Sequence, residues 1–477
     1  MGRSNAGGQN FVCGRLEPEG GTGPTKMSCR VGLAPPGTRI QRKGDILLFR
    51  LRAGKAECPL FRRRSGGGRD VCAGTVRQPG YDFRFSPGLS PSPCHSEGPR
   101  PKRRNKVDGR GGGGIYSRRW RDKGLSEQVP GRMNMLAAVL KDFDKLVLEE
   151  VPTPEPGMNE VVVRVRACGF CATDYKAIKG IRRNVTFPFI AGHEPAGVVA
   201  KVGIGVSNVK EGDEVICQPS GYCGLCMHCR AGNTHYCTHA FTTGGDGPTD
   251  VRPGAFAEYM KTDAKCLLPK PASLSFDAAA LTEPLSGAWK GVIQYSEMKV
   301  GDDVVILGVG GIGLLCLLVA KAAGAGHLIA VDPSAHAREH ALRLGATAAV
   351  DPGEGRTKER IYRILPHGPD LVVEAAGPIE AVRLMADLRR RGTRWNVFGI
   401  TTHETFKLDG GLTHFLEARM DASFGTTPLA MQKAIRLMER GLVDPEAIVT
   451  HRFPLAEIHN AVVVMGRPDR NKVIVNP

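Results

Sequence analysis

The chain has 477 residues, a formal net charge of +17 and 41% hydrophobic residues. This length allows more than one domain, and no apolar run is long enough for a membrane span or for the core of a secretory signal. The composition therefore excludes a membrane-spanning protein and predicts a cytoplasmic one.

The excess positive charge lies in the first 132 residues. They hold 27 of the 65 Lys+Arg residues and 10 of the 48 Asp+Glu residues, which leaves 38 of each for the rest. This segment is rich in Gly, Arg, Pro and Ser and has little apolar periodicity, so it cannot bury enough surface to offset the entropy of the chain. We expect residues 1–132 to be disordered.

Two interpretations of the basic segment remain open. A Gly/Arg-rich arm could bind RNA, DNA or an anionic membrane through phosphate contacts. Alternatively, Met133 and Met135 directly precede a neutral, well-patterned sequence, so the segment could be a start-site artefact. We favour the second interpretation, exclude the segment from the fold and expect no nucleic-acid partner apart from this tail.

Residues 133–290 are predicted to be β-rich. Residues 160–167 alternate apolar and charged side chains, and residues 196–202 and 213–217 are short apolar runs, each bounded by Gly or Pro. Short strands of this kind predict a barrel-like domain.

Four cysteines follow in the spacing of a closed metal site. Cys223, Cys226 and Cys229 are separated by two residues each, and Cys237 comes shortly after them. This spacing lets a tight loop direct its sulfurs to one ion, and zinc with four thiolates has no open position. The cluster predicts a structural zinc site, so the chemistry must lie elsewhere.

Residues 291–426 are predicted to form a doubly wound parallel sheet, an α/β domain. Strands are expected at residues 303–307, 327–332, 370–374 and 395–398, with helices between them. Residues 427–477 are expected to return to the first domain.

A dinucleotide site is predicted where the first of these strands ends. Gly308, Gly310 and Gly313 follow the strand and Ile312 opens the helix, an arrangement that allows close approach of a pyrophosphate to the backbone. Asp332 ends the second strand, where a carboxylate accepts hydrogen bonds from ribose hydroxyls and repels a 2'-phosphate. The expected cofactor is therefore NAD rather than NADP.

From about Met135 to the C-terminal Lys472-Val-Ile-Val475, the chain resembles the zinc-dependent medium-chain alcohol/polyol dehydrogenases, which include sorbitol and threonine dehydrogenases. The coenzyme glycines and the four-cysteine loop fall in the family's order, as do three further motifs: Gly169-Phe-Cys171-Ala-Thr173-Asp174, Gly192-His193-Glu194 and Gly254-Ala-Phe-Ala-Glu258. The resemblance implies a GroES-like catalytic domain beside a Rossmann coenzyme domain.

The resemblance also implies a catalytic zinc site. Cys171, His193 and Glu194 would be its protein ligands, with one position left for water or substrate. Glu283 stands where the polyol-type branch has an acidic residue, and we expect it to be either a direct ligand or the partner of zinc-bound water. Thr173 would accept the alcohol proton by hydrogen bond, and Asp174 would orient His193 or the ligand loop.

Two residues depart from the family's pattern. Lys176 stands where relatives commonly have a histidine of the proton relay, so the proton is expected to leave through water or the ribose. Ala337 replaces an arginine that often accompanies the ribose acid, and Arg338 follows it. We expect Arg338 to face solvent and do not assign it to the site.

The sequence therefore predicts an enzyme with one catalytic and one structural zinc. It would transfer hydride from a secondary hydroxyl of a polyol or sugar-type alcohol to NAD. A threonine- or diol-type dehydrogenase of the same family is the alternative, and nucleic-acid binding through the basic tail is a more distant one. Family members of this size imply a homotetramer in which coenzyme-domain edge strands pair.

Overall fold

The computed structural model describes residues 133–245, 250–399 and 405–477, together with six short strands in residues 1–132. The chain divides into two compact units, Met1–Asp108 and Gly109–Pro477. The rest of residues 1–132, and with it the expectation of disorder there, lies outside the described residues. The six strands form three antiparallel pairs: β1 (Phe11–Val12) with β2 (Arg30–Val31), β3 (Arg39–Lys43) with β4 (Ile46–Arg50), and β5 (Arg77–Gln78) with β6 (Tyr81–Asp82).

One long strand, β9 (Glu160–Phe170), organises the β-rich part of the second unit. Its Val161, Val163 and Val165 are buried in an apolar core, whereas Arg164 between them is exposed. Over residues 163–166 this is the alternation expected of a strand with one face on a core, whereas residues 160–163 are all buried. In spatial order its sheet contains β17 (Leu267–Pro269), β12 (Glu214–Cys217), β11 (Glu194–Val202), β9, β25 (Lys472–Asn476) and β24 (Val449–Pro454), and β16 (Tyr259–Asp263) also pairs with β9.

Smaller elements complete this part of the chain. Two further sheets are β10 (Phe189–Ile190), β7 (Asn134–Leu140) and β8 (Leu146–Pro152), and β13 (Ser220–Gly221), β14 (Phe241–Thr243) and β15 (Asp250–Arg252). The short helices are α2 (Ala172–Ile178), α3 (Met227–Arg230), η1 (Thr234–Tyr236), η2 (Ala264–Cys266) and α4 (Phe276–Ala280).

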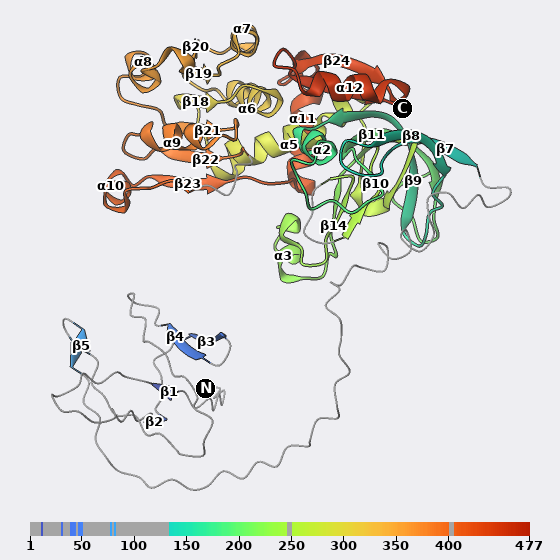
Figure 1. Ribbon diagram of the computed structural model, residues 1–477, viewed down its shortest axis with the longest axis horizontal. Helices are drawn as coiled ribbons and strands as arrows, with labels where there is room; N and C mark the ends of the chain where they lie inside the picture. The colour runs from blue at the N-terminus through green and yellow to red at the C-terminus, as the bar shows by residue number, and fades with distance from the viewer. Residues whose placement is uncertain are drawn as a thin grey trace. The chain divides into compact units, whose positions relative to one another are not determined.

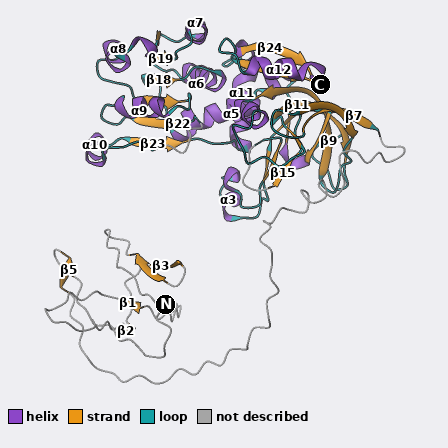
Figure 2. Cartoon of the chain, viewed as in Figure 1, coloured by secondary structure: helices purple, strands orange, loops and turns teal. Residues whose placement is uncertain are grey.

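The second half contains a six-stranded parallel sheet (Figure 1). Its spatial order is β20 (Ala348–Val350), β19 (Leu328–Val331), β18 (Val304–Leu307), β21 (Leu371–Glu374), β22 (Arg394–Val397) and β23 (Arg419–Ala422). This is the order of a doubly wound dinucleotide fold, which confirms the predicted α/β class. The connecting elements are α6 (Gly311–Ala322), α7 (Ala335–Leu344), η4 (Pro352–Glu354), α8 (Thr357–Ile364), α9 (Ile379–Asp387) and α10 (Gly410–Leu416), and helices and strands alternate along this half in Figure 2.

Two connections join the halves. Helix α5 (Thr282–Trp289) continues into a π-helix, η3 (Lys290–Tyr295), before β18 begins. After β23 the chain passes through α11 (Pro428–Glu439), η5 (Pro445–Ile448), β24, η6 (Leu455–Glu457) and α12 (Ile458–Met465) and ends in β25 of the first sheet. The C-terminal segment therefore returns to the β-rich part, while the predicted domain boundaries stay predictions. In the described part of the chain, no helix is both long and apolar enough to cross a bilayer.

Candidate metal centres and coenzyme site

Three side chains with zinc-binding atoms meet where β9 ends and β11 begins. Because β9 and β11 are antiparallel neighbours with Gly169 opposite Glu194, the residues that follow β9 lie beside those that start β11. The ligand atoms of Cys171, His193 and Glu194 all lie within 4.8 Å of one another. A thiolate, an imidazole and a carboxylate suit zinc and leave one tetrahedral position open.

Asp174 holds both ligand segments of this cluster. It is 1% exposed, and its Oδ2 accepts a hydrogen bond from the Cys171 backbone N–H at 3.0 Å. Its Oδ1 lies 3.1 Å from the His193 Nδ1 and accepts from the Gly192 N–H, also at 3.1 Å. This arrangement leaves the other ring nitrogen of His193 for a metal. The structure thus places Asp174 against both His193 and the ligand loop.

The electrostatic surroundings of the cluster fit a cation. Burial lowers the pKa of His193, but the Asp174 carboxylate and the Cys171 sulfur outweigh burial and raise it well above its ordinary value. The Glu194 side chain is only 1% exposed, so water solvates its charge poorly. The negative groups around the ring of His193 favour a cation, and the three donor types are ones that zinc binds, so the residues fit a zinc ion.

The carboxylate of Glu194 also has a buried cationic partner. Lys472 Nζ lies 2.6 Å from Oε1 and 2.5 Å from Oε2 of Glu194. The sequence did not identify Lys472 as a residue of the site, since Lys472 only marked the C-terminal end of the region that resembles the family. Its one signal was a lysine directly before the apolar run Val473-Ile474-Val475.

Thr173 and Glu283 lie beside this cluster. The Thr173 N–H lies 3.5 Å from the Cys171 sulfur in the first turn of α2. Glu283 lies in the first turn of α5 and is not one of the three residues whose ligand atoms gather within 4.8 Å. Burial raises the pKa of Glu283 to about 7, with His193 lowering it and Glu194 raising it. Glu283 is therefore an electrostatic neighbour of the cluster, and its part as ligand or water partner stays a prediction.

The four predicted structural ligands also come together. Cys223, Cys226, Cys229 and Cys237 have sulfurs within 4.8 Å of one another. Backbone N–H groups donate to these sulfurs, two of them to Cys223 at 3.3 and 3.4 Å. Amide donors favour the thiolate form that zinc binds, so the loop fits a closed zinc site.

The segment from Cys223 to Cys237, called the cysteine lobe below, is hydrogen-bonded to the π-helix between the two halves. His235 follows the third cysteine, and its Nε2 lies 2.8 Å from the Tyr295 hydroxyl at the end of η3. Within the same π-helix, Lys290 is fully buried and donates to the Phe424 carbonyl at 2.6 Å. The His235–Tyr295 hydrogen bond therefore connects the cysteine lobe to the π-helix that joins the halves, a contact that the cysteine spacing alone does not predict.

The predicted coenzyme residues gather at the end of β18. Gly308 has a positive φ of 85°, and a Cβ there would lie 2.6 Å from the backbone of Ala376. Gly310 caps the N-terminus of α6, whose first turn contains Ile312. A Cβ on Gly313 would lie 1.9 Å from the Gly308 carbonyl oxygen, so the helix packs tightly on the turn. Free N–H groups at this helix start suit a pyrophosphate.

Asp332 lies at the end of β19, as predicted for the ribose acid. Its Oδ2 accepts from the Val309 N–H at 3.0 Å and its Oδ1 from the Ser334 N–H at 2.8 Å. The expectation that Arg338 faces solvent is wrong. Its guanidinium donates to the Asp332 carbonyl at 2.7 Å and pairs with Asp351 at 2.9 Å, because α7 directs it back across the strand ends.

Comparisons with known proteins agree with these sites. Models of an alcohol dehydrogenase GroES-like domain and of a zinc-binding dehydrogenase match residues 157–272 and 311–440. The L-threonine 3-dehydrogenase of Coxiella burnetii is 32% identical over 342 residues, which cover 71% of this chain and 97% of that protein.

Solved structures are similar over the same region. A zinc-binding dehydrogenase from Sinorhizobium meliloti 1021 bound to NADP has a TM-score of 0.68 and 31% identity, covering 72% of this chain and 100% of its own. The 2R,3R-butanediol dehydrogenase from Bacillus subtilis has a TM-score of 0.65 and 25% identity, covering 72% and 99%.

Proposed function

The chain belongs to the zinc-dependent medium-chain alcohol dehydrogenase family, and on this premise we propose that it oxidises a secondary hydroxyl of a small polyol or sugar-type alcohol with NAD. It is an oxidoreductase of that family, with zinc and a nicotinamide dinucleotide as cofactors. The observation that carries the proposal is the cluster of Cys171, His193 and Glu194. The preference for NAD rests on the carboxylate of Asp332.

Each residue of the site has a proposed task. Cys171, His193 and Glu194 would hold the catalytic zinc, which when bound supplies a Lewis acid that favours the alkoxide form of an alcohol. Asp174 fixes the ring of His193 and the loop of Cys171 through the hydrogen bonds described above. Thr173 would accept the hydroxyl proton of the substrate.

A second candidate substrate class is supported by the relatives. The Coxiella relative is an L-threonine 3-dehydrogenase and the Bacillus structure is a 2R,3R-butanediol dehydrogenase. Both names describe a secondary hydroxyl next to a second polar group, as in a polyol. A threonine- or diol-type activity is therefore the alternative to a polyol-type one.

A substrate panel tests the proposal. The full-length protein would be assayed for NAD reduction with polyols, sugars, L-threonine, butanediols and simple alcohols, with and without a zinc chelator. Chelator-sensitive turnover on polyols would support the main proposal, and turnover on threonine or butanediol the alternative. Zinc and NAD binding without turnover on any compound would contradict both substrate assignments.

A homo-oligomer is proposed from one edge of the parallel sheet. Among the described strands, β23 is the last in its sheet and so presents unpaired backbone groups. Phe415 before it and Phe424 after it are 74% and 62% exposed, and Met420 within it is 37% exposed. Pairing of two copies through β23 would cover these side chains. Light scattering of wild type and of Met420→Lys would test the interface, because a buried charge should shift the protein to smaller species.

A further inference from the structure

An arginine is held beside the proposed ribose acid by a carboxylate from the next strand. Arg338 lies on α7, and one nitrogen of its guanidinium is 2.7 Å from the Asp332 carbonyl oxygen and 2.9 Å from Asp351 Oδ2. Asp351 follows β20, the parallel neighbour of β19. The two side chains are only 18% and 21% exposed, so solvent screens this pair less than a surface pair.

Asp351 is itself fixed in place. Its Oδ1 accepts a hydrogen bond from the Gly353 N–H at 2.8 Å and so caps η4, which leaves Oδ2 for Arg338. Nearby, Arg360 donates to the Asp351 carbonyl at 2.9 Å and pairs with Glu354 at 2.7 Å, so the charge of Arg360 is neutralised by Glu354. The charge of Arg338 is therefore paired with one carboxylate, that of Asp351, and with the main-chain carbonyl of Asp332.

This balance of charge bears on which dinucleotide binds. A 2'-phosphate brings negative charge to the ribose, and dinucleotide sites that accept it place an arginine nearby. Here such an arginine is present but its charge is cancelled by Asp351, and Asp332 adds a repelling carboxylate. With Asp351 neutral, one unpaired guanidinium would stand beside the ribose position.

We propose that Asp351 is a positioning residue for coenzyme choice, because it holds Arg338 on its own carboxylate and so withholds it from a 2'-phosphate. The inference rests on the proposed use of NAD at this site. It adds a second determinant of the NAD preference to Asp332 and identifies a latent NADP-binding arginine.

Binding of two nucleotide probes tests the inference without turnover. Calorimetry would compare AMP with adenosine 2',5'-bisphosphate on full-length wild type and on Asp351→Asn, since asparagine can keep the cap of η4. The variant should bind the bisphosphate about tenfold more tightly, the effect of one hydrogen bond to a charged group, with AMP affinity changed by less than about twofold. The ratio of kcat/KM for NADP over NAD should rise by a similar factor.

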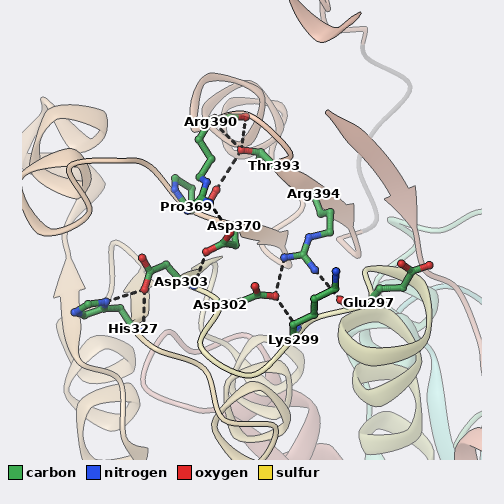
Figure 3. A network of polar contacts seen from close by, with 10 residues as sticks. All are labelled: Glu297, Lys299, Asp302, Asp303, His327, Pro369, Asp370, Arg390, Thr393 and Arg394. Carbon is green, nitrogen blue, oxygen red and sulfur yellow. Dashed lines mark hydrogen bonds and ion pairs between the residues drawn. The ribbon is translucent and has the colours of Figure 1, made fainter. Parts of the chain in front are cut away.

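Three further variants make the test specific. Asp351→Glu keeps the negative charge and should have the wild-type ratio of bisphosphate to AMP affinity. The double variant Asp351→Asn with Arg338→Gln should lose the roughly tenfold gain in bisphosphate affinity. Asp370→Asn is the charge control, because Asp370 pairs with Arg390 at 3.2 Å in another polar network (Figure 3) and comes just before β21, whereas Asp351 follows β20. It changes the net charge equally and should leave the probe ratio unchanged.

Two results would overturn the inference while leaving the proposed function intact. One is an unchanged bisphosphate-to-AMP ratio in Asp351→Asn, and the other is a gain that persists after Arg338 is removed. If wild type binds neither AMP nor NAD, the coenzyme site itself is wrong and both proposals fall.

Discussion

Lys472 and Glu194 form a buried ion pair between the last strand of the chain and the candidate catalytic cluster, with Nζ 2.6 Å from Oε1. The two residues are 6% and 1% exposed. Strand β25 pairs with β9, the strand that precedes Cys171, so the C-terminus reaches the cluster through the sheet itself. The side chain of Lys472 also passes within 3.8 Å of the position that a Cβ on Gly311 would occupy, at the start of α6. One lysine thus lies next to both the metal cluster and the dinucleotide turn.

Replacing Lys472 by Met should strongly destabilise the protein. The change leaves the Glu194 carboxylate buried without its counter-charge, and removing one partner of a buried pair costs about 3–5 kcal/mol. The midpoint of urea denaturation of the apo protein would measure this loss. Lys201→Met is the matched control, because Lys201 pairs with Glu155 at the surface, with side chains 40% and 55% exposed. It should cost less than about 1 kcal/mol, and equal losses in the two variants would contradict a buried pair.

Cys171→Ala or His193→Ala should abolish turnover while NAD binding is largely kept. Each removes a ligand of one of the two metal clusters, so zinc analysis should show loss of one ion per chain. Cys168→Ala is the control, since Cys168 is a buried neighbour outside both clusters. Normal turnover in Cys171→Ala would remove the catalytic-zinc assignment.

Cys226→Ala should mainly lower the stability of the protein, with a smaller effect on turnover. Loss of one thiolate opens the closed site, and the lobe that it holds is bonded to Tyr295 through His235. We expect a lower thermal midpoint and loss of one zinc, with residual turnover in the protein that remains folded. A variant with full zinc content and an unchanged midpoint would show that the four cysteines do not share an ion.

Much of the coenzyme-binding half could be predicted from the sequence, but two of its strands could not. Strand β18 is a run of fully buried Val, Ile and Leu, which is typical of a central parallel strand. Strands β20 and β23, at the two edges, are short, and Val350 is their only β-branched residue; their Ala and Asp residues are depleted in strands. Pairing with their neighbours in the sheet, rather than local sequence, makes them strands.

The same contrast holds for the site. Cys171, His193 and Glu194 stand in short motifs, so the sequence could identify them before their geometry was known. Lys472 lies 278 residues from Glu194, and no local pattern joins the two. Arg338 looked like an ordinary helix charge because its partner Asp351 belongs to the unpredicted strand end at β20. Long-range pairs of this kind become visible only when the strands are placed side by side.

Asp332→Ala should weaken the preference for NAD. The substitution removes the carboxylate that repels a 2'-phosphate, so KM for NADP should fall relative to KM for NAD. Coenzyme titrations at a fixed alcohol concentration would measure the ratio. An unchanged ratio would show that another group reads the ribose.

Lys290 should give the folded protein an unusual dependence on alkaline pH. Burial lowers the pKa of Lys290 to about 8, although Glu283 opposes the shift. In the unfolded chain a lysine keeps its proton to about pH 10.4. Between these values the unfolded state binds more protons, so the free energy of unfolding should rise with pH through this contribution. Urea denaturation from pH 7.5 to 10 should show that the free energy of unfolding of wild type rises relative to that of Lys290→Met.

Lys179→Met provides the control for this trend. Its hydrogen bond to Asp144 raises the pKa of Lys179 in the folded protein above the pKa in the unfolded chain. The stability contributed by that lysine is therefore lost only as the pH rises through this raised pKa. The difference between wild type and Lys179→Met should therefore stay constant from pH 7.5 to 10. A constant difference for Lys290→Met as well would contradict the lowered pKa. It would mean that the Phe424 carbonyl and the ring of Tyr295, 5.2 Å from Nζ, stabilise the ammonium as well as water does.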